Sequence, residues 1–272
     1  MQKVLSITNK YMILATPLIL YSLITSIYLV SSLSAGRLIN LIFGLILLFF
    51  MTSAFLSGWF NMIKLAISTP EREDTNSLIK EFIPGVGEYF LSTSGALLII
   101  LIMFFITIAI TSLIGSNLIG DMGISSNDLV KAMQSQTALK SFILGLNPEQ
   151  MNKILSWNLL ITFTTTCGSL LVFLYMPVLF LKTKNPILAF WYSLKSFFSK
   201  KIFKTIGVYL LIFIAYFFIS ILSAIFGSNI IGHFAITLLN FYFIIVAGVG
   251  VFYYYYNNFI ETKLGQKVDV EI

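Results

Sequence analysis

Few residues in this sequence are of the types that usually perform chemistry. The chain has one histidine, His233, and one cysteine, Cys167. A single cysteine forms no intramolecular disulfide, and both residue types are common metal ligands that are here nearly absent. The phosphate loop GxxxxGK(S/T), the HExxH motif and the GxSxG motif do not occur. We therefore predict no catalytic residues, no cofactor, no metal site and no enzymatic activity.

Charged residues within apolar segments usually mark ion pathways or proton relays. The long apolar segments of this chain carry almost none. Lys64 and Glu88 lie at the ends of two segments, and His233 lies near the edge of another. All three side chains can reach the membrane surface, which argues against a proton-coupled pump.

Uncharged polar residues offer a second type of candidate site. Asn158, Thr162 and Thr165 lie in the fourth long apolar segment, and Asn61 lies in the second. These side chains could line a polar cavity for a neutral or small solute, as in a transporter or permease. They could instead make hydrogen bonds between helices or to carbonyl groups of their own helix. We favour the structural interpretation and keep the polar cavity as the alternative.

The third candidate site is the basic segment that begins at Lys182. Asn185 is a favourable N-cap and Pro186 suits a first helical position, which predicts a helix over 186–199. Its apolar residues share one face, and lysines follow it, as in a helix at the membrane surface. The apolar face comprises Ile187, Phe190, Trp191, Leu194 and Phe198. The residues predicted to contact lipid headgroups are Trp191, Lys195, Lys200, Lys201 and Lys204.

The elements that position these residues follow from composition and segment length. Apolar residues make up 58% of the 272 residues and charged residues 10%, against about 25% charged in soluble proteins. Each of six continuous apolar segments is long enough to cross a membrane, and their length favours helices over β-barrel strands. We predict an all-α fold, a polytopic six-helix transmembrane bundle with cytoplasmic interfacial amphipathic helices. It forms one membrane domain, 1–272, with spans at 11–33, 39–63, 89–115, 154–181, 206–227 and 230–256.

The distribution of lysine and arginine predicts the orientation. Thirteen of these residues fall in the two termini and the even-numbered loops, and four fall in the odd-numbered loops. Cytoplasmic loops carry the excess of positive charge, so both termini should be cytoplasmic. This asymmetry explains the net charge of +6 without a nucleic-acid partner. The first apolar segment could be a signal peptide, but its length favours a retained helix.

The loops contain further helix signals. In the second loop, Leu78, Ile79, Phe82 and Ile83 predict a short surface helix, which the segment 84–87 should break before span three. In the third loop, Leu129, Met133, Leu139 and Phe142 predict one amphipathic helix between a start at 125–128 and an end at Gly145. Asn147 should cap the fourth span, and Pro177 should kink it.

The segments Leu174–Pro177, Lys182–Pro186 and Ala189–Lys195, with Phe203 and Lys204 before the next span, resemble a known pattern. They are similar to bacterial multi-span families that include the membrane domain attached to some glycerophosphodiester phosphodiesterases. The segment Gly58–Lys64 fits the same pattern. The resemblance covers spans two to five and implies a fold and a bacterial cytoplasmic (inner) membrane location. No phosphodiesterase catalytic domain is present, so that activity is not implied.

The sequence therefore predicts a non-enzymatic integral membrane component. Its expected partners are membrane lipids, together with a protein partner or a further copy of the chain as a homo-oligomer. A transporter or permease for a neutral or small solute is the alternative function.

Overall fold

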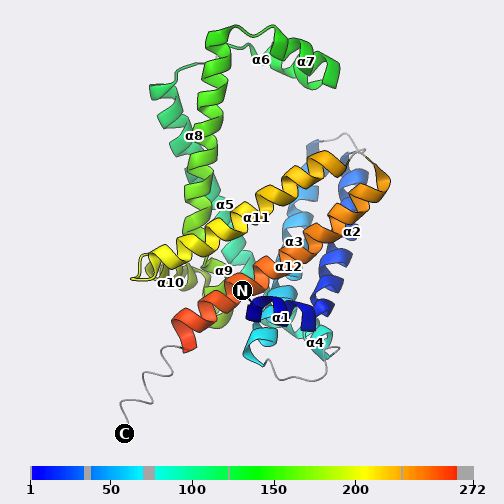
Figure 1. The fold of residues 1–272 in the computed structure, drawn as a ribbon, viewed down its shortest axis with the longest axis vertical. Helices are drawn as coiled ribbons and strands as arrows, with labels where there is room; N and C mark the ends of the chain where they lie inside the picture. Colours follow the sequence, from blue (N-terminus) through cyan, green and yellow to red (C-terminus); the bar gives the residue numbers. More distant parts are fainter. Residues whose placement is uncertain (1, 34–37, 70–76, 122, 228, 262–272) are drawn as a thin grey trace. The chain divides into compact units, whose positions relative to one another are not determined.

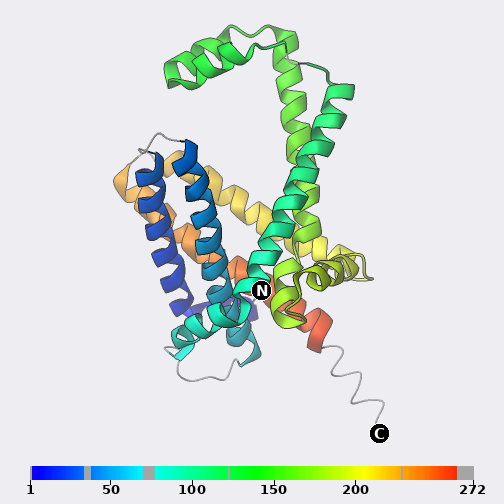
Figure 2. The ribbon, with the colours of Figure 1, turned by 180° about the vertical axis from the view of Figure 1, so that it is seen from behind.

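The computed structural model describes residues 2–33, 38–69, 77–121, 123–227 and 229–261, and these residues form helices without β-strands (Figures 1 and 2). Four of the basic residues on which the predicted orientation depends lie outside these ranges, namely Arg37, Arg72, Lys263 and Lys267. The α-helices are α1 (Gln2–Lys10), α2 (Ala15–Leu33), α3 (Leu38–Ser68), α4 (Ser77–Lys80), α5 (Phe82–Leu118), α6 (Ser126–Met133), α7 (Gln136–Leu144), α8 (Pro148–Val172), α9 (Tyr175–Leu181), α10 (Pro186–Phe197), α11 (Ile202–Phe226) and α12 (Ile230–Tyr255). A 3₁₀ turn, η1 (Met12–Leu14), precedes α2, and a π-helical turn, η2 (Tyr256–Glu261), follows α12.

The prediction of an all-α fold with six spans is confirmed. Six helical segments of the described chain are long and apolar enough to cross a membrane, and the chain is a multi-pass membrane protein. They are Met12–Val30, Ile42–Ser68, Phe82–Leu118, Pro148–Leu181, Ile202–Phe226 and Ile230–Glu261. Many large apolar side chains on these helices are exposed, as expected where a helix surface contacts acyl chains.

The chain forms two compact units. Unit 1 comprises Met1–Ile99 and Leu171–Ile272, and unit 2 comprises Ile100–Leu170. Helices α5 and α8 each contribute residues to both units.

Helix α3 contributes several residues to the core of unit 1. Its Trp59, Met62 and Ile63 are buried, and the Trp59 indole N–H donates to the Leu14 carbonyl at 3.0 Å. The ring of Phe60 lies 5.1 Å from that of Phe252 on α12. Aromatic pairs at such separations stabilise beyond the area that they bury. Helix α3 therefore contacts both η1 and α12.

Two glycines allow other helices of unit 1 to approach α3 closely. A Cβ atom at Gly85 would lie 2.6 Å from the Asn61 Cβ, and one at Gly248 would lie 3.1 Å from both the Ile63 Cδ1 and the Trp59 ring. Close helix packing at small residues is thus present at Gly85 and Gly248. Gly87 has no atom within 4 Å of its hypothetical Cβ and has no such role.

The predicted break at residues 84–87 is wrong, since α5 starts at Phe82 and continues through them. Pro84 is the third residue of α5, where a missing N–H removes no intrahelical bond. The preceding surface helix is reduced to the single turn α4. Leu78 is buried, whereas Phe82 and Ile83 already belong to α5. The predicted apolar face is therefore divided between two helices.

The fourth span is interrupted between Val172 and Tyr175, where α8 ends and α9 begins. Pro177 is the third residue of α9, and its ring would clash with the carbonyl of Phe173 in a continuous helix. The sequence thus predicted the distortion correctly, and the break lies one turn before the proline.

In unit 2, α5 and α8 pack through small and polar residues. The hydroxyl groups of Thr111 and Thr164 lie 2.7 Å apart. A Cβ at Gly115 would lie 2.2 Å from the Trp157 ring, and the Trp157 indole N–H donates to the Gly120 carbonyl at 3.2 Å. Gly120 has a φ of 77°, which glycine adopts easily and which turns the chain after α5.

The third loop contains two helices, α6 and α7, instead of the single predicted one. The Ser135 hydroxyl accepts from the Ala138 N–H at 3.1 Å and caps a second helix. The prediction of one helix, which used the spacing of apolar residues, did not include this cap. The predicted end at Gly145 is confirmed. The side chains of Leu129 and Met133 lie outside the described part of α6. The Asn147 side chain caps α8 by accepting from Gln150 N at 2.8 Å, as predicted.

The N-terminal residues before the first span form α1, a helix that was not predicted. This helix lies against α12, where the Tyr242 hydroxyl donates to the Asn9 side-chain oxygen at 2.9 Å. Val4 is buried, and its Cγ1 atom lies 3.7 Å from a hypothetical Cβ at Gly250.

Candidate functional site

Helix α10 forms as predicted. The Asn185 side chain accepts hydrogen bonds from the N–H groups of Ile187 and Leu188 at 3.0 and 3.2 Å, and Pro186 occupies the first turn. Ala189, Ser193 and Phe197 are buried, and their spacing of four residues defines one packed face. This face attaches α10 to the rest of unit 1.

The opposite face of α10 is apolar and exposed. Ile187, Trp191 and Phe198 are 71%, 67% and 66% exposed, which in water would be an unfavourable surface for three large apolar side chains. Lys195 on α10 and Lys200 in the turn that follows it are also exposed. An exposed apolar face flanked by lysines is typical of a helix that lies in the membrane interface.

The turn before α10 is held against α5 and α9 by charge, a hydrogen bond and packing. The Lys184 ammonium lies 2.9 Å from the Glu88 carboxylate. The Tyr175 hydroxyl donates to the Pro186 carbonyl at 3.0 Å, and a Cβ at Gly95 would lie 2.8 Å from the Pro186 ring. These contacts determine the orientation of α10 within unit 1.

A second lysine joins this group. The Lys64 ammonium donates to the Tyr89 hydroxyl at 2.7 Å and lies 5.1 Å from the centre of its ring. Lys184 lies 5.4 Å from the same ring, which stacks on Phe180 with 4.3 Å between centroids. Lys64 and Glu88 were predicted at the ends of spans, but the contact of Lys184 with this group was not predicted. No local pattern links three positions so far apart in the chain.

The predicted headgroup lysines have different environments. Lys195, Lys200 and Lys204 are exposed. Lys201 is partly buried, donates to the Asn258 carbonyl and lies 5.3 Å from the Phe259 ring. Lys201 therefore also ties the start of α11 to the turn after α12.

The residues of the predicted polar cavity are not assembled within either unit. Asn61 belongs to unit 1, where it is buried and its side-chain amide donates to the Glu81 carbonyl at 3.1 Å. Asn158, Thr162 and Thr165 belong to unit 2 and are exposed on α8. The threonine that contacts α5 is Thr164.

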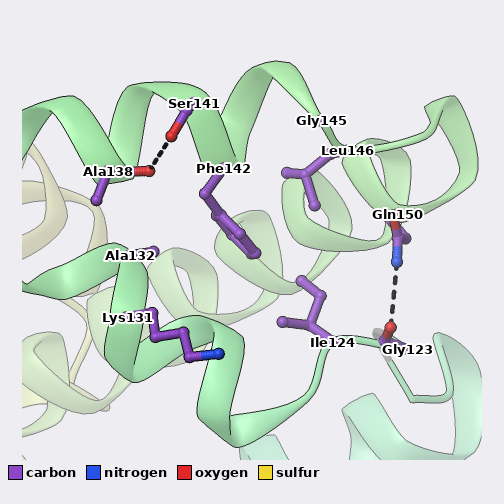
Figure 3. A pocket seen from close by; sticks show the side chains of 10 residues that line it. All are labelled: Gly123, Ile124, Lys131, Ala132, Ala138, Ser141, Phe142, Gly145, Leu146 and Gln150. Carbon is purple, nitrogen blue, oxygen red and sulfur yellow. Dashed lines mark hydrogen bonds between the residues drawn. The ribbon is translucent and has the colours of Figure 1, made fainter.

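Unit 2 contains a cavity of about 440 Å³ between α6, α7 and the start of α8 (Figure 3). The side chains of Ile124, Phe142 and Leu146 point into it, and Lys131 lies at its edge. At one end the Gln150 side-chain amide donates to the Gly123 carbonyl at 3.1 Å. Among the described residues of the lining there is one cation and no carboxylate or histidine, so these residues offer no acid–base pair.

Within the described residues no group of three or more His, Cys, Asp or Glu side chains could hold a metal ion. Cys167 is exposed on α8. The most distinctive charged surface of unit 1 is thus α10 with its flanking lysines.

Comparisons with protein-family models, with curated proteins and with solved structures find no match for this chain.

Proposed function

We propose that this protein is a non-enzymatic component of a bacterial cytoplasmic membrane, with both termini in the cytoplasm, that binds anionic lipid through α10. The observation that supports this function is the exposed face of α10. Ile187, Trp191 and Phe198 can enter the boundary between headgroups and acyl chains, while Lys195 and Lys200 face lipid phosphates. Each lysine near an anionic surface contributes about 1 kcal/mol.

The rigid attachment of α10 supports the same proposal. Helix α10 is capped by Asn185, packs through Ala189 and Ser193, and is linked to α5 through Lys184. It therefore needs little further ordering when it meets a lipid surface. Preorganisation of this type lowers the entropic cost of binding. The resemblance noted in the sequence is compatible with this location.

The fluorescence of Trp191 provides a direct test. We would reconstitute the full-length protein in nanodiscs that contain phosphatidylcholine and phosphatidylglycerol, with bromine atoms on the acyl chains of one lipid at a time. The Trp191 signal is the difference between the wild type and Trp191→Phe. We expect stronger quenching when phosphatidylglycerol carries the bromine.

A matched pair of variants assigns the preference to the lysines. The double variant Lys195→Gln/Lys200→Gln should remove the preference for phosphatidylglycerol. Lys131→Gln/Lys140→Gln has the same change in charge in unit 2 and should retain it, since both of its lysines are exposed elsewhere. Equal quenching by the two lipids in the wild-type protein would refute the proposal.

A further inference from the structure

A groove of about 340 Å³ lies in unit 1 between α11 and α12, two helices that run side by side in both views (Figures 1 and 2). Small-ligand sites in proteins typically have volumes of roughly 300–1,000 Å³. Most of the lining is apolar and includes Val208, Leu211, Ile212, Phe243 and Val246. Leu211 is 49% exposed, so the groove is open at the outer surface of these spans.

Small residues create the space. Ala215 on α11, and Ala247 and Gly250 on α12, all line the groove with little or no side chain. Val4 of α1 also lines the groove, and its Cγ1 atom would lie 3.7 Å from a Cβ atom at Gly250. Larger residues at these positions would fill the groove, so its volume depends on particular residues of this sequence.

The length of the groove corresponds to one leaflet of a membrane. Lys204 and Ala215 share a face of α11 with Val208 and Leu211, since these positions recur at helical spacing. The lining residues of α12 run from Phe243 to Tyr254, so at 1.5 Å per residue the groove extends about 16 Å along this helix. This is about half of a hydrocarbon core that is roughly 30 Å thick.

One end of the groove is polar and basic. Asn257 and Asn258 line this end, and Lys201 donates to the Asn258 carbonyl. The Lys201 ammonium has three donors, so it can also bind an anion. Lys204, exposed one turn before Val208, adds a second positive charge.

The nearby Tyr254 is not available for headgroup binding. Its hydroxyl lies 2.8 Å from that of Thr205, and this hydrogen bond is buried. The pair instead fixes the spacing of α11 and α12 beside the groove.

We propose that this groove binds one acyl chain of an anionic phospholipid whose phosphate is held by Lys201 and Lys204. The apolar walls match the chain, the length matches one leaflet, and the two lysines lie at the end where the headgroup belongs. The assignment rests on the proposed function for its lipid and its orientation, and it adds a defined site to the less specific surface of α10.

Photo-crosslinking tests this site directly. Full-length protein in nanodiscs is irradiated with phosphatidylglycerol that carries a diazirine near the end of one acyl chain, and the adducts are mapped by mass spectrometry. We expect adducts concentrated on groove residues such as Ala215, Phe243 and Ala247. Competition by unlabelled phosphatidylglycerol should exceed competition by phosphatidylcholine.

Variants of the groove provide the controls. Ala215→Phe and Ala247→Phe, on opposite walls, should each abolish the groove adducts. Ala109→Phe makes the same change at an exposed position of α5 in unit 2 and should leave them unchanged. Lys204→Gln should raise the amount of phosphatidylglycerol needed for competition about fivefold, the effect of one lysine at an anionic surface.

The outcomes separate the two proposals. Adducts spread evenly over the exposed faces of the spans, or equal competition by the two lipids, would overturn the groove site even when Trp191 still prefers phosphatidylglycerol. Loss of the Trp191 preference with retained groove adducts would instead overturn the proposed function and leave the groove intact.

Discussion

The Lys184 ammonium lies 2.9 Å from the Glu88 carboxylate, and this ion pair joins the turn before α10 to the first turns of α5. The two side chains are 58% and 42% exposed, so solvent screens much of their attraction. The pair therefore acts mainly on the position of α10, and its contribution to total stability is small.

Replacement of Lys184 by methionine should lower the free energy of unfolding by less than about 1 kcal/mol. Amide hydrogen exchange in α10 should nevertheless become faster, because one of its attachments is lost. Lys153→Met breaks the comparable 2.9 Å pair with Glu149 on α8 and serves as the control. Unchanged exchange in α10 of Lys184→Met would show that packing alone positions this helix.

Gly115 and Gly87 lie in the same helix but in different environments. A methyl group at residue 115 meets the Trp157 ring, whereas a methyl group at residue 87 meets no atom within 4 Å. Gly115→Ala should destabilise the protein by about 1–3 kcal/mol, as overpacking does. Gly87→Ala should be neutral or stabilise by up to about 1 kcal/mol, because glycine is unfavourable inside a helix. Denaturant titration in detergent would measure both, and equal stabilities would contradict the packing of Trp157 on Gly115.

Two threonines of α8 should likewise differ in how much each contributes to the free energy of unfolding. Thr164 shares a hydrogen bond with Thr111, whereas Thr162 is exposed. Thr164→Val should cost about 0.5–1.5 kcal/mol, the net value of one hydrogen bond, and Thr162→Val should cost less. A double-mutant cycle with Thr111→Val measures the coupling. A coupling energy near zero would mean that the two hydroxyl groups contribute independently.

The orientation of the spans can be tested by fusion to alkaline phosphatase, which is active only outside the cytoplasm. A fusion after Gly123 should be active, and a fusion after Asn185 should be inactive, since thirteen basic residues mark the side that carries α10. The opposite result would place α10 and its lysines outside the cytoplasm.

The local elements of the structure were largely predictable. The Asn185 cap, the Asn147 cap and the distortion near Pro177 each depend on residues within one or two turns. The break predicted at Pro84 was wrong because a proline in the first turn of a helix does not interrupt it. The position of a proline relative to the helix start, and not its presence, decides the outcome.

The candidate sites were predictable only in part. The exposure of Ile187, Trp191 and Phe198 on α10 followed from helical spacing within fourteen residues, whereas Phe190 and Leu194 of the same predicted face are half-buried. The contacts of Lys64 and Lys184 with Tyr89 did not, because α3, α5 and the turn before α10 must first pack together. The groove beside Lys204 likewise requires Ala215, Ala247 and Val4 to meet from three helices.

By itself, the sequence determined that this is an all-α protein with six segments long enough to cross a membrane, because span length and apolar composition are properties of each segment alone. The tertiary structure decided which side chains of those segments face one another. It buried Asn61 in unit 1, paired Thr164 with Thr111 in unit 2, and left the polar residues Asn158 and Thr162 exposed. In a chain whose helices are apolar on every side, the hydrophobic pattern does not identify the packed face. Small residues, hydrogen bonds and shape decide it.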